Sequence, residues 1–206
     1  MNALIIVDVQ NDFMPGGSLP VPNGDSIIEV INRVEEKFEV IAATVDWHPA
    51  GHNSFASSYK GKKPFDIINI NGRQQTLWPD HCVQGSKGAE FHPGLETRPI
   101  EAIFRKGMNP DIDSYSGFYD NGHQKSTGLA GFLREKKADR LFICGLAGDV
   151  CVYYTVLDAI KEGFKAVMIE DAVRPLDIQE FENIKRKLSN IGSDIVKAIK
   201  IYPVST

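Results

Sequence analysis

Three side chains of complementary chemistry occur at or just after apolar runs that have the composition of strands. Asp8 is the one charged residue in the run 3–9, where a carboxylate is costly unless it is paired or used. Lys106 ends the run IFRK, and Cys151 follows the run LFIC after a short turn. An acid, a base and a thiol together could form an activated nucleophile with a proton acceptor. Plainer roles stay open, because Asp8 could cap a loop and Lys106 could lie at the surface.

The segment GLAGDVC places Cys151 at a strand-to-helix turn, in the first turn of the next helix. Free backbone N–H groups and the positive end of the helix dipole are expected there, and both favour a thiolate. A buried small side chain is the commoner fate of a cysteine, and Cys144 in the run LFIC fits that role. Cys82 lies beside a histidine and stays undecided. The turn favours Cys151 as the nucleophile.

A second polar group has side chains that bind metal ions, in the segments DWHPAGH and LWPDHCVQG. Its members are Asp46, His48, His52 and His81. An aspartate and a histidine two residues apart at a strand end, with a distant histidine, could make a mixed site for zinc or another divalent ion. The spacing alone is a weak indication, because loop histidines often make hydrogen bonds instead. We assign that plainer role to His92 and His123.

Several aromatic side chains lie in segments without regular periodicity. Near a polar cluster, such side chains can line a pocket for a flat ligand. They can also anchor loops to the core, and some must do so. The aromatic candidates are Phe13, Trp47, Trp78, Tyr115, Phe118 and Tyr119.

Strands alternate with helices along the chain. Apolar β-branched runs, typical of strands buried on both faces, predict strands at 3–9, 40–45, 102–105, 140–144 and 165–170. Helical spacing of apolar residues predicts helices at 24–37, 129–137, 149–162 and 178–189. Residues 194–204 fit either element.

This alternation predicts one α/β domain, residues 1–206, with a mainly parallel sheet and helices on both faces. Segment 46–99 lacks periodicity, and long irregular segments in a compact domain are usually functional. Sites in such sheets lie beyond the carboxyl ends of the strands. The groups at strand ends are Asp8, Asp46, Lys106 and the turn 145–151. We therefore expect them to converge at one edge of the sheet.

Composition excludes several classes of protein. The 206 residues include 23 lysines and arginines and 27 aspartates and glutamates, so the net charge is −4, which disfavours a nucleic-acid partner. Three cysteines do not make a disulfide scaffold and suit a reducing compartment. The apolar run ALIIV near the start is too short for a signal peptide or a membrane span. We expect a cytoplasmic protein with no membrane partner.

Seven motifs occur in order over roughly residues 4–175. They are VDVQNDFMPGGSLPV, TVDWHPAGHNSF, LWPDHCVQGSKGAEFHPGL, RKG, DSYSGF, ICGLAGDVCV and EDA at 170–172. With them the chain resembles the nicotinamidase/pyrazinamidase family of the isochorismatase-like cysteine hydrolases. The superfamily shares the aspartate, the lysine and the cysteine, whereas DWHP together with WPDHCVQG points to the nicotinamidase branch.

The resemblance implies a single domain with a six-stranded, mostly parallel sheet of order 3-2-1-4-5-6. It also implies roles for individual residues, which are as follows. The catalytic residues would be Asp8, Lys106 and Cys151, the metal ligands Asp46, His48 and His81, and the substrate-binding aromatic residues Phe13, Trp78 and Tyr115. His52 matches a position that is a ligand in some members and not in others, so it is left open.

The resemblance further implies a cis peptide between Leu146 and Ala147, and an oxyanion hole made by the backbone N–H groups of Ala147 and Cys151. One departure is Gly148, where the family usually has threonine. The loop before the nucleophile is therefore expected to be looser. The backbone donors do not depend on that side chain, so the oxyanion assignment is kept.

The function implied by the resemblance is hydrolysis of nicotinamide to nicotinate and ammonia through a cysteine thioester, and of pyrazinamide to pyrazinoate, in NAD salvage. It implies one divalent metal ion, zinc first with iron or manganese as alternatives, and a small-molecule substrate; a homo-oligomer is left open. The runner-up is an amidase acting on a carbamoyl or ureido compound, which would not need the three metal ligands. A metal-stabilised binding protein without chemistry is disfavoured because all three catalytic positions are filled. Isochorismate hydrolysis is disfavoured because it needs no thiol.

Overall fold

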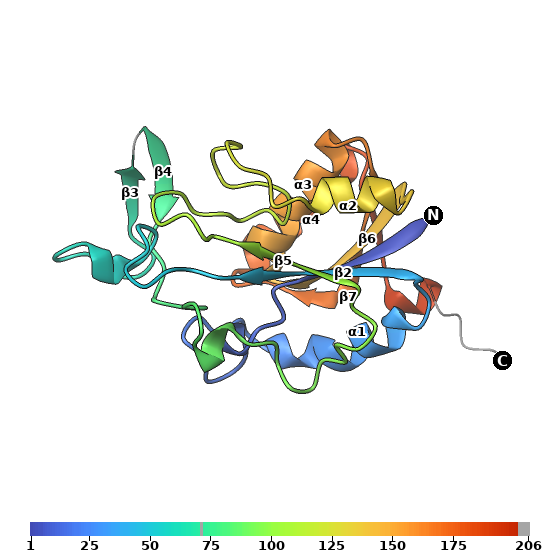
Figure 1. Ribbon diagram of the computed structural model, residues 1–206, viewed down its shortest axis with the longest axis horizontal. Coiled ribbons are helices and arrows are strands. Elements are labelled where there is room, and N and C mark those ends of the chain that lie inside the picture. The colour runs from blue at the N-terminus through green and yellow to red at the C-terminus, as the bar shows by residue number, and fades with distance from the viewer. Residues whose placement is uncertain (71, 202–206) are drawn as a thin grey trace.

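A computed structural model describes residues 1–70 and 72–201. Its main sheet has six parallel strands in the order β5-β2-β1-β6-β7-β8 (Figure 1). The strands are β1 (Asn2–Val7), β2 (Val40–Asp46), β5 (Ala102–Lys106), β6 (Arg140–Leu146), β7 (Lys165–Arg174) and β8 (Asp194–Val196). Numbered by their succession along the chain, these strands have the order 3-2-1-4-5-6, so the predicted sheet is confirmed.

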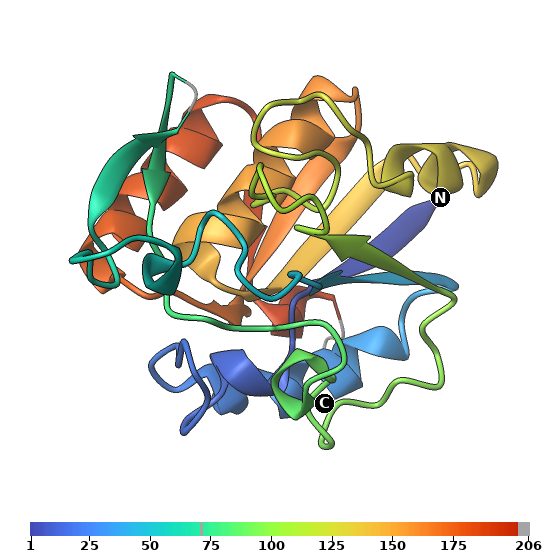
Figure 2. The same cartoon turned by 60° about the vertical axis from the view of Figure 1, so that its left-hand side comes forward.

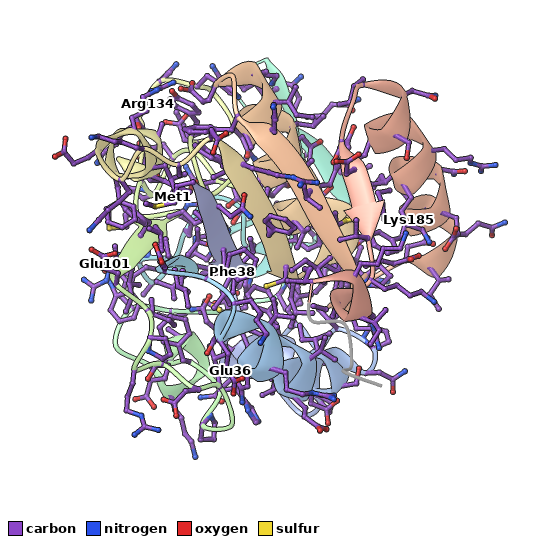
Figure 3. All side chains as sticks on the ribbon, turned by 90° about the vertical axis from the view of Figure 1, so that its right-hand side faces the viewer. Met1, Glu36, Phe38, Glu101, Arg134 and Lys185 are labelled. Carbon is purple, nitrogen blue, oxygen red and sulfur yellow. The ribbon has the colours of Figure 1, made fainter. Side chains whose placement is uncertain are left out.

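Helices cover both faces of this sheet (Figure 2). On one face α1 (Ile28–Glu35) packs on Leu4 and Ile6 of β1. On the other, α2 (Leu129–Glu135), α3 (Tyr153–Lys161) and α4 (Ile178–Asn190) pack on the alternate β1 residues Ala3, Ile5 and Val7. Successive side chains of a strand point to opposite faces, so the continuous apolar run of β1 supplies both cores. Figure 3 views the molecule from the right-hand side of Figure 1, with Glu36 after α1, Arg134 on α2 and Lys185 on α4.

Several predicted boundaries shift. The helix expected at 24–37 begins with a 3-10 turn, Gly24–Ile27, before α1. The helix expected at 149–162 begins with a π-helical turn, Gly148–Val152, before α3. The strand expected at 165–170 continues to Arg174, because its end pairs again with β6 after a register shift.

Helix α4 begins where predicted, because the Asp177 carboxylate accepts hydrogen bonds from the N–H groups of Gln179 and Glu180 at 2.7 and 3.0 Å. The ambiguous tail forms β8 and a 3-10 turn, Ala198–Lys200, and residues 202–204 lie outside the described residues.

The segment 46–99 contains an element that the sequence did not predict. Strands β3 (Ile67–Ile70) and β4 (Arg73–Thr76) form an antiparallel hairpin apart from the main sheet, near the carboxyl ends of β2 and β5 (Figure 1). The sequence RQQT of β4 is polar, so it lacks the apolar alternation by which strands are recognised. Within the described part of the chain, no helix has the length and apolarity needed to cross a membrane.

Candidate active site

Lys106 lies at the centre of the predicted site. The parallel register sets it opposite Asp46, and its side chain is fully buried. Its ammonium nitrogen lies 2.9 Å from Asp8 Oδ2, 2.5 Å from Asp46 Oδ1 and 3.4 Å from Cys151 Sγ. It also donates to the carbonyl oxygen of Ser114 at 2.9 Å. The structure therefore brings Asp8, Lys106 and Cys151 together, and it excludes the surface role for Lys106.

The charges around Lys106 explain its own protonation state and that of Asp46. Burial alone would lower the pKa of Lys106, but the charges of Asp46 and Asp8 outweigh it and hold the pKa well above its usual value. Burial alone would raise the pKa of Asp46, but Lys106 and His48 hold that pKa well below its usual range. Lys106 and Asp46 thus form a buried ion pair at neutral pH.

Asp8 follows β1 with a φ of 51°, in the left-handed region. Its carboxylate lies between Thr44 of β2 and Lys106 of β5. Thr44 Oγ1 donates to Asp8 Oδ1 at 2.7 Å, and Lys106 approaches Oδ2 as an ion pair without good hydrogen-bond alignment. Burial raises the pKa of Asp8 to about 6, against the lowering effect of Lys106. A carboxyl with that pKa can take and return a proton near neutral pH.

Cys151 lies in the π-helical turn after β6. Its Sγ and one carboxyl oxygen each of Asp8 and Asp46 lie within 4.8 Å of one another. Burial raises the pKa of Cys151 well above its usual value; Lys106 lowers it, and the two carboxylates raise it further. The resting group is therefore a thiol, which differs from the thiolate expected of a helix N-terminus. The reason is that burial and two nearby anions outweigh the ammonium.

Asp46 also belongs to a group that could hold a metal ion, with His48 and His81. His48 Nε2 lies 3.6 Å from Asp46 Oδ1, and His81 Nε2 lies 3.8 Å from Asp46 Oδ2. Each ring turns its Nδ1 to a backbone carbonyl, Gly107 O at 3.0 Å for His48 and Pro79 O at 2.8 Å for His81. With an ion bound, a proton on Nδ1 of each ring would leave Nε2 free to ligate it, which is the arrangement that metal-binding histidines use. The donor set fits a divalent ion.

His52, which the sequence left open, has a different environment. Its Nδ1 lies 2.8 Å from Ser54 Oγ and accepts from the Ser54 N–H at 3.0 Å. Its Nε2 lies 2.8 Å from the carbonyl oxygen of Asn109, so that nitrogen carries the proton. Its ring centre lies 4.6 Å from that of His48. Both nitrogens are thus occupied, and in this arrangement His52 packs beside the metal group without offering it a lone pair.

Gln10 is a site residue that sequence reasoning missed. It is fully buried, its Oε1 accepts from the backbone N–H of Asp46 at 2.8 Å, and its Nε2 donates to the Asp46 carbonyl at 2.8 Å. Nε2 also donates to Ala89 O at 2.8 Å. One side chain therefore fixes the backbone of Asp46 on both sides. Its position two residues after Asp8, at the same strand end, was the available signal.

The pocket above Cys151 is lined by the three aromatic side chains that the resemblance implied, Phe13, Trp78 and Tyr115, with Ala147 beside them. The other three aromatic candidates lie elsewhere. Trp47 stacks on the Arg105 guanidinium, Phe118 is in the core, and Tyr119 donates to Glu162. His92 makes the expected loop hydrogen bond, accepting from the Gly94 N–H at 3.1 Å. His123 stacks on Tyr119, and its Nε2 lies 3.4 Å from Asp158 Oδ1.

The turn before Cys151 contains the expected cis peptide between Leu146 and Ala147. Gly148 is packed tightly, because a Cβ there would lie 2.6 Å from Val173 Cγ1 and 2.8 Å from Phe181 Cε2. The expectation of a looser loop is therefore wrong: β7 and α4 fill the space that a threonine would need.

All three cysteines are free and buried. Cys144 lies in the core, as expected, with its Sγ 3.6 Å from the Ile5 carbonyl. Cys82 is held by its backbone N–H, which donates to Asp12 Oδ2 at 2.7 Å next to His81. It therefore supports the loop that carries His81.

Residues 2–198 match the pattern of the Isochorismatase domain. This chain belongs to the isochorismatase family. It is 49% identical over 181 residues to a nicotinamidase of Escherichia coli, covering 86% of this chain and 84% of that protein. Among solved structures, PnC1 from L. infantum in complex with nicotinate superposes with a TM-score of 0.85 at 40% identity, covering 96% of this chain and 93% of that one. Pyrazinamidase of Pyrococcus horikoshii in complex with zinc has a TM-score of 0.79 and 39% identity, covering 95% and 98%.

Proposed function

We propose that this protein is a metal-dependent nicotinamidase, which hydrolyses nicotinamide to nicotinate and ammonia and also hydrolyses pyrazinamide to pyrazinoate. The observation that carries this proposal is the contact of Lys106 Nζ with Asp8, Asp46 and Cys151, of which Asp46 and Cys151 line an aromatic pocket. The E. coli relative is a nicotinamidase, and the L. infantum relative binds nicotinate. Nicotinate released in this way would enter NAD salvage. Free, buried cysteines are consistent with the cytoplasm.

In the first half of the reaction Asp8 takes the proton of the Cys151 thiol, and the sulfur attacks the carboxamide carbon. Lys106 stabilises the thiolate and the carboxylates during this transfer. The backbone N–H groups of Ala147 and Cys151 bind the oxyanion; one such donor is typically worth about 3–4 kcal/mol. Asp8 then gives its proton to the leaving nitrogen, the C–N bond breaks, and ammonia leaves a thioester on Cys151.

In the second half Asp8 accepts a proton from water, whose oxygen attacks the thioester carbon. The C–S bond breaks, the acid is released, and Cys151 regains its proton from Asp8. The pKa of Asp8, about 6, suits both directions of transfer. One carboxyl thus acts as base and acid in each half.

The metal group contributes to substrate binding in this proposal. Asp46, His48 and His81 would hold a divalent ion, for which we propose zinc with iron and manganese as alternatives. When bound, such an ion supplies an electrophile that orients the ring nitrogen of the substrate. Phe13 and Trp78 would flank the ring. The same group disfavours the carbamoyl or ureido amidase, which has no need of it.

Replacing the nucleophile tests the proposal directly. We expect Cys151→Ala to release no ammonia from nicotinamide while it remains folded, binds nicotinate and keeps about one divalent ion per chain by elemental analysis. The matched control is Cys144→Ala, which removes a buried thiol from the core and should retain turnover. Ammonia release by Cys151→Ala near the wild-type rate would refute the mechanism.

A further inference from the structure

The β3–β4 hairpin turns one side chain toward the candidate active site. Gln75 of β4 is 8% exposed, whereas its neighbours Arg73 and Gln74 are exposed. Successive residues of a strand face opposite sides, so Gln74 lies on the other face of β4 from Gln75, although both line the polar cleft between the hairpin and α3. The burial of a polar amide on an otherwise exposed hairpin requires partners, and these lie in the segment that follows β5.

The Gln75 amide contacts two side chains of that segment. Its Nε2 lies 3.1 Å from the Tyr115 hydroxyl oxygen and 3.1 Å from Asp113 Oδ2, and it donates to the Thr76 carbonyl at 2.7 Å. An amide nitrogen carries two hydrogens, so these are shared among three acceptors. The Tyr115 oxygen accepts from Gln75, so the hydroxyl proton must point in another direction. Gln75 thereby links the Tyr115 hydroxyl to the hairpin.

Asp113 depends on the same amide. It is 4% exposed, and its Oδ1 accepts from the Ser114 N–H at 2.8 Å, which leaves Oδ2 to Gln75. A buried carboxylate oxygen that loses its donor carries a large desolvation cost. Without Gln75, the segment after β5 would have to move to give Asp113 Oδ2 another donor, and Tyr115 would move with that segment.

These two side chains form a wall between two cavities. Asp113 and Tyr115 line the pocket above Cys151, and both also line a polar cleft between the hairpin and α3. Gln75 lines the outer cleft and contacts the inner pocket through this wall. Phe65, which precedes β3, packs edge-on against Trp78 of the inner pocket, with 6.0 Å between the ring centres.

We propose that Gln75 is a positioning residue that sets the affinity of the pocket for the aromatic ring of the substrate by holding Tyr115 and Asp113 in this wall. This inference rests on the proposed nicotinamidase function. Gln75 touches none of the reacting groups, so it acts on ring binding more than on the chemical step. Its effect should therefore appear in KM and in product affinity.

The test compares two substitutions on one strand. We expect Gln75→Leu, which keeps the size and removes the donors, to raise KM for nicotinamide about tenfold with kcat within about twofold of wild type. The dissociation constant of nicotinate, measured by calorimetry, should rise by a similar factor. Gln74→Leu, the matched control, should leave all three values unchanged. An unchanged KM in Gln75→Leu, or equal effects of the two substitutions, would overturn the inference.

A double variant shows whether the effect passes through Tyr115. Gln75→Leu combined with Tyr115→Phe should raise KM by about as much as the larger single change, because both remove the same contact. A KM rise equal to the product of the two single effects would contradict the proposed route. If Gln75→Leu does not fold, Gln75→Glu replaces it, since it keeps the shape and cannot donate. A wild-type protein without ammonia release would refute the proposed function instead, while an active wild type with an insensitive Gln75 refutes this inference alone.

Discussion

Lys106 holds two carboxylates and a thiol around a single ammonium, and this arrangement fixes which proton can move. The low pKa of Asp46 and the high pKa of Lys106 keep that pair charged across the neutral range. The proton that can move rests on the Cys151 thiol and is taken by Asp8, whose pKa is about 6. The residue types at the three strand ends suggested the trio but left a surface position for Lys106 open, and the family resemblance implied the catalytic roles. The protonation states depend on burial and on Asp46, which residue types alone do not show.

The pKa of Asp8 predicts the acid limb of the pH profile of kcat/KM. Its carboxylate form takes the thiol proton, and below about pH 6 the group is protonated, so kcat/KM should fall about tenfold per pH unit there. The Thr44 hydroxyl lowers this pKa by its hydrogen bond, so Thr44→Val should move the limb to higher pH. The measurement is kcat/KM for nicotinamide as a function of pH for both proteins. A limb that does not move in Thr44→Val would contradict this assignment.

Glu35 predicts a pH dependence of stability. It is 3% exposed on α1, and neither carboxyl oxygen has a hydrogen-bond partner among the described residues. Burial, with Glu96, raises its pKa to about 7. The folded state therefore binds this proton more tightly than the unfolded state, so the contribution of Glu35 to stability is fully present below its usual pKa of 4.5 and is lost as the pH rises to about 7.

Glu35→Gln should remove this dependence and raise the free energy of unfolding at alkaline pH by about 1–2 kcal/mol. Urea unfolding at acid and at alkaline pH measures it. Glu36→Gln, at the exposed neighbouring position, is the matched control and should change little. Equal effects of the two substitutions at alkaline pH would show that Glu35 is not the titrating group.

The elements bring these groups together because parallel strands end at one edge. β1, β2, β5 and β6 end with Val7, Asp46, Lys106 and Leu146, which places the site segments side by side. The periodicity of apolar residues was sufficient to predict these strands, whereas their order in the sheet was implied by the family resemblance. It could not predict the β3–β4 hairpin, whose polar strand β4 is stabilised by the contacts of Gln75 with Asp113 and Tyr115.

The packing of α4 on the π-helical turn predicts the cost of the family threonine. Gly148→Thr would place a Cβ against Val173 and Phe181, and we expect a loss of about 1–3 kcal/mol in the free energy of unfolding. Adding Phe181→Leu should recover part of the loss, because the two sites share one space. Gly131→Ala on α2, where a Cβ meets nothing within 4 Å, serves as the control. A Gly148→Thr variant as stable as wild type would disprove this account.

At the scale of the whole molecule, the metal group ties the sheet to the long irregular segment. Asp46 and His48 lie at and after the end of β2, and His81 lies in the segment that follows the hairpin. The types of these residues suggested a metal site from the sequence. The orientation of the rings could not be predicted, because it depends on carbonyl groups of Gly107 and Pro79 that the fold brings into place.

A metal that binds the folded chain stabilises it by mass action, by about 2.7 kcal/mol at a free concentration 100 times the Kd. Removing it with a chelator should lower Tm, and adding zinc should restore it. His81→Ala should weaken both responses. Calorimetry of the metal-loaded and chelated proteins measures this, and identical melting curves for the two would argue against a metal site at Asp46, His48 and His81.

Asp46 gives one oxygen to Lys106 and the other to the side of His81. The counterion of the lysine is thus also one of the three proposed metal ligands, so a single carboxylate links the two halves of the site. If zinc is the bound ion, as proposed, exchanging it for a softer or harder ion would change the charge that Asp46 presents to Lys106, and so the turnover number as well as substrate affinity.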